Sequence, residues 1–568
     1  MCRRRKSVLC GALTVLFLLG CEDESAIEVD RDLPAERPNI LLVVVDDMGF
    51  ADLGSFGSEI PTPNLDKLAY AGVRLTNFIA GPACSPTRAM LLTGVDAHRA
   101  GFGNLKEELA PNQRGKPGFE GYLPDNVITV ASLLRDGGYR TYMTGKWHLG
   151  VEASASPAVR GFDKSFAMMI NASHFADMRP AYHPDPDAKA EYRENDVVLE
   201  ALPSDFEYSS QYYVDHLIDY LDEDAGNEKP FFAYLAFSAP HWPLQAPDDA
   251  LERFRGKYDE GYDVALERRL NAQKKLGLLP STAQASGRAP KGRPWDALSD
   301  AEKRVEARGM EVYAAMVAEI DRHSGRLVEY LRQSGQLDNT VIIFLSDNGA
   351  EGHDYDDTWP AEAFPAIRKS IDDRHDFSYE NMGRQNSYTL YGPNWARVSA
   401  PAFRLYKAFP TEGGVRAPAF VHFPGRFASE TISHALVLAK DIASTILEIA
   451  TVKHPGSEYS GRAIEPMTGV SAVSVFEGQT TPARITAPRV HADELIGKRG
   501  IRRGEWKLVH MPKPYGNGDW QLYNLVKDPA ESVDLAADMP ELVAELAMVW
   551  EQYAEDNGVV LPDWVSGY

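Results

Sequence analysis

Short apolar runs alternate along the chain with longer segments in which apolar residues recur every three or four positions. The runs are rich in Val, Ile and Phe, which is typical of strands buried on both faces of a parallel sheet, and the longer spacing is typical of helices. This alternation predicts an α/β fold: a large doubly wound, mostly parallel sheet flanked by helices. The clearest predicted strands are 40–45, 139–143, 231–237 and 341–345.

Two segments between the strands have patterns of their own. Apolar positions from Met310 to Gln333 keep helical spacing, and Gly335 follows as a stop signal, so we expect a core-packed helix there. Residues 248–306 are instead rich in Arg, Lys and Glu, which predicts a solvated helical insertion near 248–306.

The chain has 568 residues, enough for several domains at roughly 150 residues each. We expect two: a main α/β domain over 37–433 and a smaller C-terminal α+β domain over 434–568. The second domain contains a strand-like segment at 500–509 and a helical segment near 541–556. A short antiparallel sheet is therefore predicted for it.

Polar side chains follow the predicted strands directly. In an open, doubly wound sheet, ligands bind outside the carboxyl ends of the strands, so these side chains are expected to share one edge. They are Asp46, Asp47, Lys146, His148, His241, Asp347 and Asn348.

Four of these residues form a candidate cation site. The carboxylates of Asp46, Asp47 and Asp347 and the amide of Asn348 offer only hard oxygen ligands, which suit Ca²⁺ or Mg²⁺ and not Zn²⁺. Calcium is favoured, because so many protein oxygens leave little room for the water molecules that Mg²⁺ retains. Each pair alone could equally be a turn or helix cap, but two pairs at two strand ends favour a metal.

The N-terminus predicts export. Basic residues 3–6 precede an apolar run over 8–19, which is too short for a relaxed membrane span of about 20 residues. Gly20-Cys21 at its end favours a lipoprotein-type signal over 1–20, a lipid on Cys21 and a polar tether over 21–36. The protein would then lie in the bacterial periplasm or outer membrane. An ordinary cleaved signal peptide is the alternative.

Charge and cysteine content reduce the number of possible functions. The formal charge is −23, so nucleic acid is not an expected partner, and a membrane is expected only through the lipid. Of the cysteines Cys2, Cys10, Cys21 and Cys84, only the last remains after export and lipidation. A single thiol in an oxidising compartment is unusual and indicates either a buried apolar residue or a reactive group.

The sequence around Cys84 favours a reactive group. Ser85 is a suitable N-cap, Pro86 suits a first helical position and Gly94 suits a helix end. Cys84 is therefore expected at the positive end of a short helix, which stabilises nearby negative charge. Arg88 lies one helical turn further on and can reach the same atoms.

The segment Cys84-Ser85-Pro86-Thr87-Arg88, followed by Thr93-Gly94, resembles the signature of formylglycine-dependent sulfatases, which belong to the alkaline phosphatase superfamily. The resemblance is strongest to bacterial arylsulfatases and covers nearly the whole chain after the signal. It extends over 39–49, 144–150, 239–247, 346–352 and 405–418.

The resemblance implies an activity and a set of residues. A maturation enzyme would oxidise Cys84 to formylglycine, whose hydrate attacks a sulfate ester and forms a sulfated enzyme intermediate. One Ca²⁺ ion would be bound by Asp46, Asp47, Asp347, Asn348 and the modified Cys84. The residues implied around the hydrate and the sulfate are Arg88, Lys146, His148, His241 and Lys407, together with Cys84 itself.

Two other functions remain open. Related formylglycine enzymes cleave phosphonate or phosphate esters, and a catalytically silent surface lipoprotein could keep the fold for glycan binding. Lys407 by itself would be read as a solvated lysine, and only its place before 412–418 selects it. The alcohol half of the substrate, whether aryl, alkyl or polysaccharide, is undetermined; the aromatic stretch 386–395 is a candidate contact for it.

Overall fold

A ten-stranded sheet runs through the protein in a computed structural model that describes residues 37–479 and 489–564. Its strand order is β11-β2-β10-β9-β1-β8-β4-β5-β6-β7. In that order the strands span Thr431–Ser433, Val73–Leu75, Ala419–His422, Thr340–Ser346, Asn39–Val45, Phe231–Ala236, Arg140–Lys146, Lys164–Met168, Tyr192–Glu194 and Val197–Val198.

The centre of this sheet is parallel. β1 pairs in parallel with β8 and β9, and β4 pairs in parallel with β8 and β5. β10 is antiparallel to both its neighbours, β9 and β2, and β6 and β7 add an antiparallel edge. The predicted large, mostly parallel sheet is therefore confirmed.

The alternation of side chains along β1 builds two separate cores. Leu41, Val43 and Val45 belong to one hydrophobic cluster, and the intervening Ile40 and Leu42 belong to another. Successive residues of a strand point to opposite faces, so a continuous apolar run is what a sheet covered on both faces requires.

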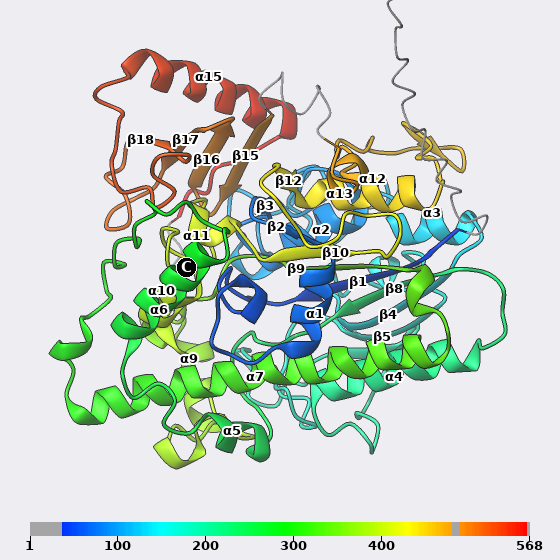
Figure 1. The fold of residues 1–568 in the computed structure, drawn as a ribbon, viewed down its shortest axis with the longest axis horizontal. Coiled ribbons are helices and arrows are strands. Elements are labelled where there is room, and N and C mark those ends of the chain that lie inside the picture. Colours follow the sequence, from blue (N-terminus) through cyan, green and yellow to red (C-terminus); the bar gives the residue numbers. More distant parts are fainter. Residues whose placement is uncertain (1–36, 480–488, 565–568) are drawn as a thin grey trace, which may run out of the picture. The chain divides into compact units, whose positions relative to one another are not determined.

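Helices cover both faces. The first cluster is closed by α1, α4 and α7, and the second by α2, α3 and α12, on opposite sides of the sheet in Figure 1. These helices span Pro63–Ala71, Ser209–Glu223, Asp300–Gln333, Cys84–Thr93, Val130–Asp136 and Ala439–Ile449. Shorter elements are β3 Phe78–Ile79, paired with β12 Val437–Leu438, and α8 Tyr355–Thr358, α9 Pro365–Arg374, α10 Gly392–Ser399, α11 Glu412–Val415 and α13 Val473–Phe476.

Two predicted segments differ in extent. The helix expected from Met310 starts ten residues earlier, at Asp300, because Ser299 and Glu302 form a capping box that precedes the apolar spacing. The charged region near 248–306 contains α5 (Asp248–Phe254) and α6 (Tyr262–Lys275) before α7 begins.

A second, antiparallel sheet of four strands lies near the C-terminus. Its strands β15 to β18 span Val490–Leu495, Lys498–Arg503, Trp506–His510 and Trp520–Asn524, and α15 (Pro540–Asn557) packs on it. The single strand expected at 500–509 is thus two strands joined by a turn. The described residues from Arg37 onward form one compact unit, and the boundary at 434 stays a prediction.

The predicted signal and tether, including Cys21, lie outside the described residues. Within 37–479 and 489–564, no helix combines the length and the apolar character needed to cross a lipid bilayer.

A buried histidine joins the C-terminal sheet to the loop that follows α2. Nε2 of His98 lies 3.2 Å from Oε2 of Glu494 on β15, and Nδ1 lies 3.5 Å from Asp96. Burial lowers the pKa of His98, but the hydrogen bonds to Asp96 and Glu494 outweigh burial and raise the pKa to about 9.

The contacts of His98 with Asp96 and Glu494 should make the free energy of unfolding depend on pH. The pKa of His98 is about 6.5 in the unfolded chain, so its stabilising effect is complete below that pH and is lost as pH rises through about 9. His98→Gln is expected to lower the free energy of unfolding by on the order of 3 kcal/mol near pH 6, and by less near pH 10. Urea unfolding at both pH values measures this, with the exposed His183→Gln as control; an equal loss at both would contradict it.

Candidate active site

The polar residues predicted at strand ends meet at one edge of the main sheet. Asp46 and Asp47 follow β1 directly, and Asp347 and Asn348 follow β9, which pairs with β1 in register. The backbone N–H of Asp47 donates to Oδ1 of Asp347 at 3.3 Å. The parallel register thus places the carboxylate of Asp347 against the backbone of Asp47, 300 positions away in the chain.

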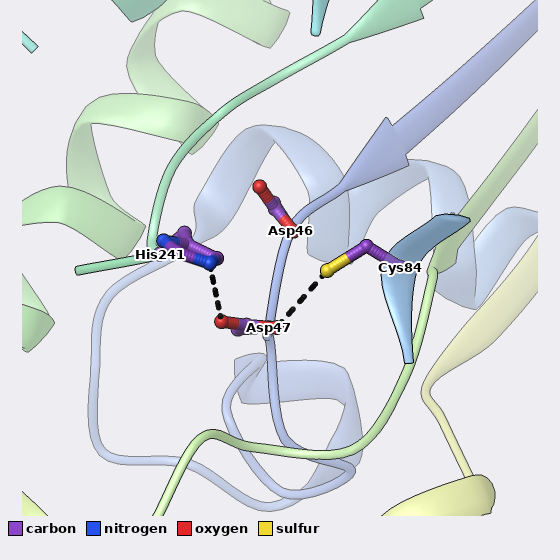
Figure 2. Close-up of side chains that lie close together, drawn as sticks. All are labelled: Asp46, Asp47, Cys84 and His241. Atoms are coloured by element: carbon purple, nitrogen blue, oxygen red, sulfur yellow. Dashed lines mark hydrogen bonds and ion pairs between the residues drawn. The ribbon is translucent and has the colours of Figure 1, made fainter. Parts of the chain in front are cut away.

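Cys84 is the first residue of α2. The helix is capped by the extended Ala83, and it ends at Gly94, whose φ of +68° suits glycine. The expectation that Ser85 caps the helix was wrong: Ser85 lies in the first turn, and its buried Oγ has no hydrogen-bond partner among the described residues. The helix begins at Cys84, two residues before the expected Pro86, so Cys84 itself lies at the positive end of the helix. It lies beside Asp47, with Sγ 3.9 Å from Oδ1 (Figure 2).

Arg88 holds the carboxylate that follows β9. Its Nε donates to Oδ2 of Asp347 at 2.8 Å, and its Nη2 lies 2.7 Å from the same oxygen. Nη1 donates to the backbone carbonyl of Lys146 at 2.8 Å. The arginine is fully buried, so it connects α2, β4 and β9 as well as supplying positive charge.

Two buried ammonium groups face the carboxylates. Lys146, the last residue of β4, donates to Oδ2 of Asp46 at 2.6 Å, and Lys407 donates to Oδ2 of Asp47 at 3.0 Å. Lys407 also lies 3.3 Å from Oε2 of Glu351. Both lysines therefore bridge the carboxylate cluster and the space around residue 84.

A tight approach of two loops brings Lys407 to the site. Its backbone N–H donates to the carbonyl of Ala350, and the N–H of Gly349 donates to the carbonyl of Gly414. A Cβ on Gly349 would lie 1.9 Å from the carbonyl oxygen of Gly413, so only glycine permits this contact.

The two histidines of the site contact different carboxylates. Nε2 of His241 is 3.6 Å from Oδ2 of Asp47, as Figure 2 shows, and its Nδ1 is 2.5 Å from the carbonyl oxygen of Trp242. Nε2 of His148 is 3.6 Å from Oε1 of Glu107. Burial lowers the pKa of both rings, with Lys407 adding to the effect at His241 and Lys146 at His148.

The carboxylates have shifted pKa values in both directions. Burial alone would raise the pKa of Asp46, but Lys146, His241 and Arg88 outweigh it and hold that pKa well below its usual range. Burial raises the pKa of Asp47 to about 7, against Lys407 and with help from Asp46. The surroundings therefore favour the ionised form of Asp46, whereas burial and the charge of Asp46 oppose ionisation of Asp47.

The cluster fits a hard divalent cation. Oδ1 of Asp46 and Oδ1 of Asn348 are buried without a hydrogen-bond partner among the described residues, and each such atom is costly unless something else satisfies it. Asp46, Asp47, Cys84 and His241 offer ligand atoms that all lie within 4.8 Å of one another. A bound cation would satisfy the two oxygens and reduce the repulsion between Asp46 and Asp47.

Two cavities meet beside residue 84. A narrow cleft is lined by Cys84, His148, His241 and Lys407, and a second cavity of about 440 Å³ shares His148 with it and opens to one side. Further residues common to both are Glu107, Asn171 and Tyr182. The structure thus brings all the predicted site residues to one edge, next to a space large enough for a small molecule.

Several neighbours had no recognised signal in the sequence. Glu351 is only three residues after the predicted ligand Asn348, so its closeness in the sequence could have suggested it. Nothing in the sequence marks Glu107 or Tyr182 as site residues. Only part of the aromatic stretch 386–395, predicted to contact the substrate, lies near the site. Tyr388 packs beside Trp242, whereas Trp395 is fully buried in the core.

Comparison with known proteins agrees with this geometry. The sulfatase family model matches residues 38–452, and a model described as N-sulphoglucosamine sulphohydrolase, C-terminal, matches residues 403–555. An uncharacterized sulfatase of Schizosaccharomyces pombe is 41% identical over 94% of this chain and 96% of its own, and an arylsulfatase of Klebsiella aerogenes is 37% identical over 78% and 92%.

Solved structures agree on the fold. The crystal structure of Ps i-CgsB in complex with k-i-k-neocarrahexaose is 23% identical, covers 94% of this chain and 95% of its own, and superposes with a TM-score of 0.64. A single family model spans most of the main sheet and every strand end of the site. The chain therefore belongs to the sulfatase family of sulfuric ester hydrolases.

Proposed function

We propose that the protein hydrolyses sulfate esters with a nucleophile made by oxidising Cys84 to formylglycine, supported by one Ca²⁺ ion. The observation that carries the proposal is the position of Cys84: buried, at the start of α2, and in contact with Asp47. The lysines that contact Asp46 and Asp47 provide the charge that an anionic substrate needs in an otherwise acidic protein.

The surroundings of Cys84 argue against catalysis by the thiol itself. Burial raises the pKa of Cys84 well above its usual value, and Asp46 raises it further. Because the thiolate is the reactive form of cysteine, an unmodified Cys84 is a poor nucleophile. Oxidation to a hydrated aldehyde would replace the thiol by hydroxyl groups that the same charges can activate.

Each contact suggests a role. Asp347, held by Arg88, helps to deprotonate one hydroxyl of the oxidised residue 84, whose oxygen attacks sulfur. Lys146 and Lys407 hold the sulfate oxygens, and His241 or Lys407 protonates the departing alcohol. His148 then takes the proton of the other hydroxyl, the C–O bond between residue 84 and the sulfate breaks, and sulfate is released as the aldehyde re-forms.

The cation would be held by Asp46, Asp47, Asp347 and Asn348 with residue 84. When bound, it would supply positive charge to the sulfate oxygens and to the oxygens of residue 84. The two unpartnered buried oxygens of Asp46 and Asn348 are the observation that supports its presence.

The charge of the site favours a sulfate ester over a phosphate monoester. Four carboxylates, those of Asp46, Asp47, Asp347 and Glu351, face three permanent cations, which are Arg88, Lys146 and Lys407. With all of them ionised, a divalent cation would leave the site with a single positive charge. A sulfate monoester carries one negative charge, whereas a phosphate monoester carries close to two at neutral pH.

The side cavity is the proposed place of the alcohol half of the substrate. It adjoins the cleft at His148 and has a volume of about 440 Å³, within the usual range for small-molecule sites. The proposed partners are thus a small-molecule or glycan sulfate ester and the enzyme that matures Cys84.

The two lysines should be essential for rate. Lys146→Met or Lys407→Met is expected to lower kcat/KM for an aryl sulfate by on the order of 10²-fold or more, as removal of one oxyanion donor does elsewhere. Lys164→Met on β5 is the matched control, because that lysine pairs with Glu223 on the surface. Steady-state kinetics measure the effect, and near-normal rates in both site variants would contradict the assignment.

Two measurements on one preparation test the function itself. Mass spectrometry of the peptide that contains residue 84, from protein made in its native host, should show formylglycine. Parallel assays with a sulfate monoester, a phosphate monoester and a phosphate diester should show hydrolysis of the sulfate ester as the main activity. Active protein with an entirely unmodified thiol, or a preference for either phosphate ester, would refute the proposal.

Export as a lipoprotein through Cys21 is also a proposal, supported by the sequence over 1–21 alone. Membrane fractionation of the native host with and without Cys21→Ala tests it: the variant should leave the membrane fraction. An unchanged distribution would favour an ordinary cleaved signal.

A further inference from the structure

Glu107 and Tyr182 form a hydrogen-bonded pair at the junction of the two cavities. Tyr182 donates its hydroxyl to Oε1 of Glu107 at 2.7 Å, which fixes the carboxylate in one orientation. The same Oε1 lies 3.6 Å from Nε2 of His148. Three side chains from separate segments of the chain therefore form a row that ends on the proposed base.

The two nitrogens of His148 have different environments. Nε2 faces a carboxylate, whereas Nδ1 is buried and has no hydrogen-bond partner among the described residues. A carboxylate accepts only from N–H, so it favours the ring form with the proton on Nε2. Nδ1 is then left unprotonated, which is the state that a base requires.

The backbone adds to this arrangement. His148 has a positive φ of 55°, and its N–H donates to the carbonyl of Met169 at 3.0 Å. Lys146 and Arg88 are the cations that face the ring, and both oppose its protonation. Glu107 is the carboxylate that faces it, so it is the group that can stabilise the imidazolium formed when His148 accepts a proton.

We infer that Glu107, held by Tyr182, is a positioning residue that keeps the proton on Nε2 of His148, so that Nδ1 accepts the proton released when sulfate leaves residue 84. The inference rests on the proposed function. The distance of 3.6 Å is longer than a hydrogen bond, as is common for catalytic pairs before substrate binds.

The test separates positioning from substrate binding. Glu107→Gln keeps the shape but removes the charge, and it should lower kcat by on the order of 10- to 100-fold with little change in kcat/KM, because kcat/KM does not include the steps that follow formation of the sulfated intermediate. Because the slowed step is the release of sulfate, quenched steady-state samples should contain more residue-84 peptide heavier by one sulfate group. Tyr182→Phe, which keeps the carboxylate, should show the same changes to a smaller extent, and Glu107→Asp should restore part of the rate.

Glu152→Gln is the matched control, because Glu152 lies nearby but pairs with Lys106. It should leave kcat and the sulfated fraction unchanged. A higher KM at unchanged kcat in Glu107→Gln would overturn the inference and make Glu107 a substrate contact; unchanged kinetics would also overturn it. If Glu107→Gln folds poorly, the kinetics of Glu107→Asp and Tyr182→Phe test the inference in its place. Wild-type protein that contains formylglycine but hydrolyses no sulfate ester would overturn the proposed function, and this inference with it.

Discussion

Cys84→Ser is expected to abolish turnover, lowering kcat by on the order of 10⁴-fold or more, as loss of a nucleophile does in other hydrolases. Serine has one hydroxyl, so a sulfate ester formed on it can leave only through a second attack at sulfur. A hydrated aldehyde instead releases sulfate when its second hydroxyl loses a proton, the proton we assign to His148.

This difference predicts that the Cys84→Ser variant accumulates a sulfate ester on residue 84. After incubation with an aryl sulfate, the residue-84 peptide of Cys84→Ser should be heavier by one sulfate group, whereas Cys84→Ala should remain unmodified. Met90→Leu on the same helix serves as the control, since Met90 faces the core and not the cleft. Sustained turnover by Cys84→Ser would rule out the proposed chemistry.

Removal of the cation is expected to have the second large effect. Exhaustive chelation should reduce sulfatase activity to background, because three buried carboxylates next to residue 84 would then repel an anionic substrate. Addition of Ca²⁺ should restore activity, Mg²⁺ should restore less, and Zn²⁺ should not replace it, because the ligands are hard oxygens.

A second readout does not depend on activity. A ligand that binds only the folded state raises Tm, so Ca²⁺ should stabilise the metal-free protein in thermal unfolding. Asp347→Asn should weaken that stabilisation, and Asp556→Asn, at the exposed end of α15, should leave it unchanged. Full activity in protein whose measured metal content is zero would contradict the metal assignment.

Much of the fold could be predicted because the apolar runs are continuous. A strand such as β1 is buried on both faces, so every residue from Ile40 to Val45 is apolar and the pattern is plain. The extent of α7 could not be predicted from spacing, because its first turns are held by a capping box and carry charged residues.

The start of α2 was misplaced by two residues for a related reason. Ser85 has the chemistry of a cap, but the extended backbone of Ala83 leads into the helix, and Thr87 donates its hydroxyl to the carbonyl of Ala83. The preference of a single residue for the cap position is therefore a weak guide to where a helix begins.

By itself the sequence determined which chemistry the protein carries: a motif around Cys84, polar residues after apolar strands, and charges that suit an anionic ester. Only the tertiary structure decided which groups touch. Parallel pairing of β1 with β9 brings Asp47 against Asp347, and the approach of two glycine-containing loops brings in Lys407. Glu107 contacts His148, which lies 41 positions further along the chain, and no local sequence pattern predicts this contact. Contacts between loops depend on where the packed sheet and helices place those loops.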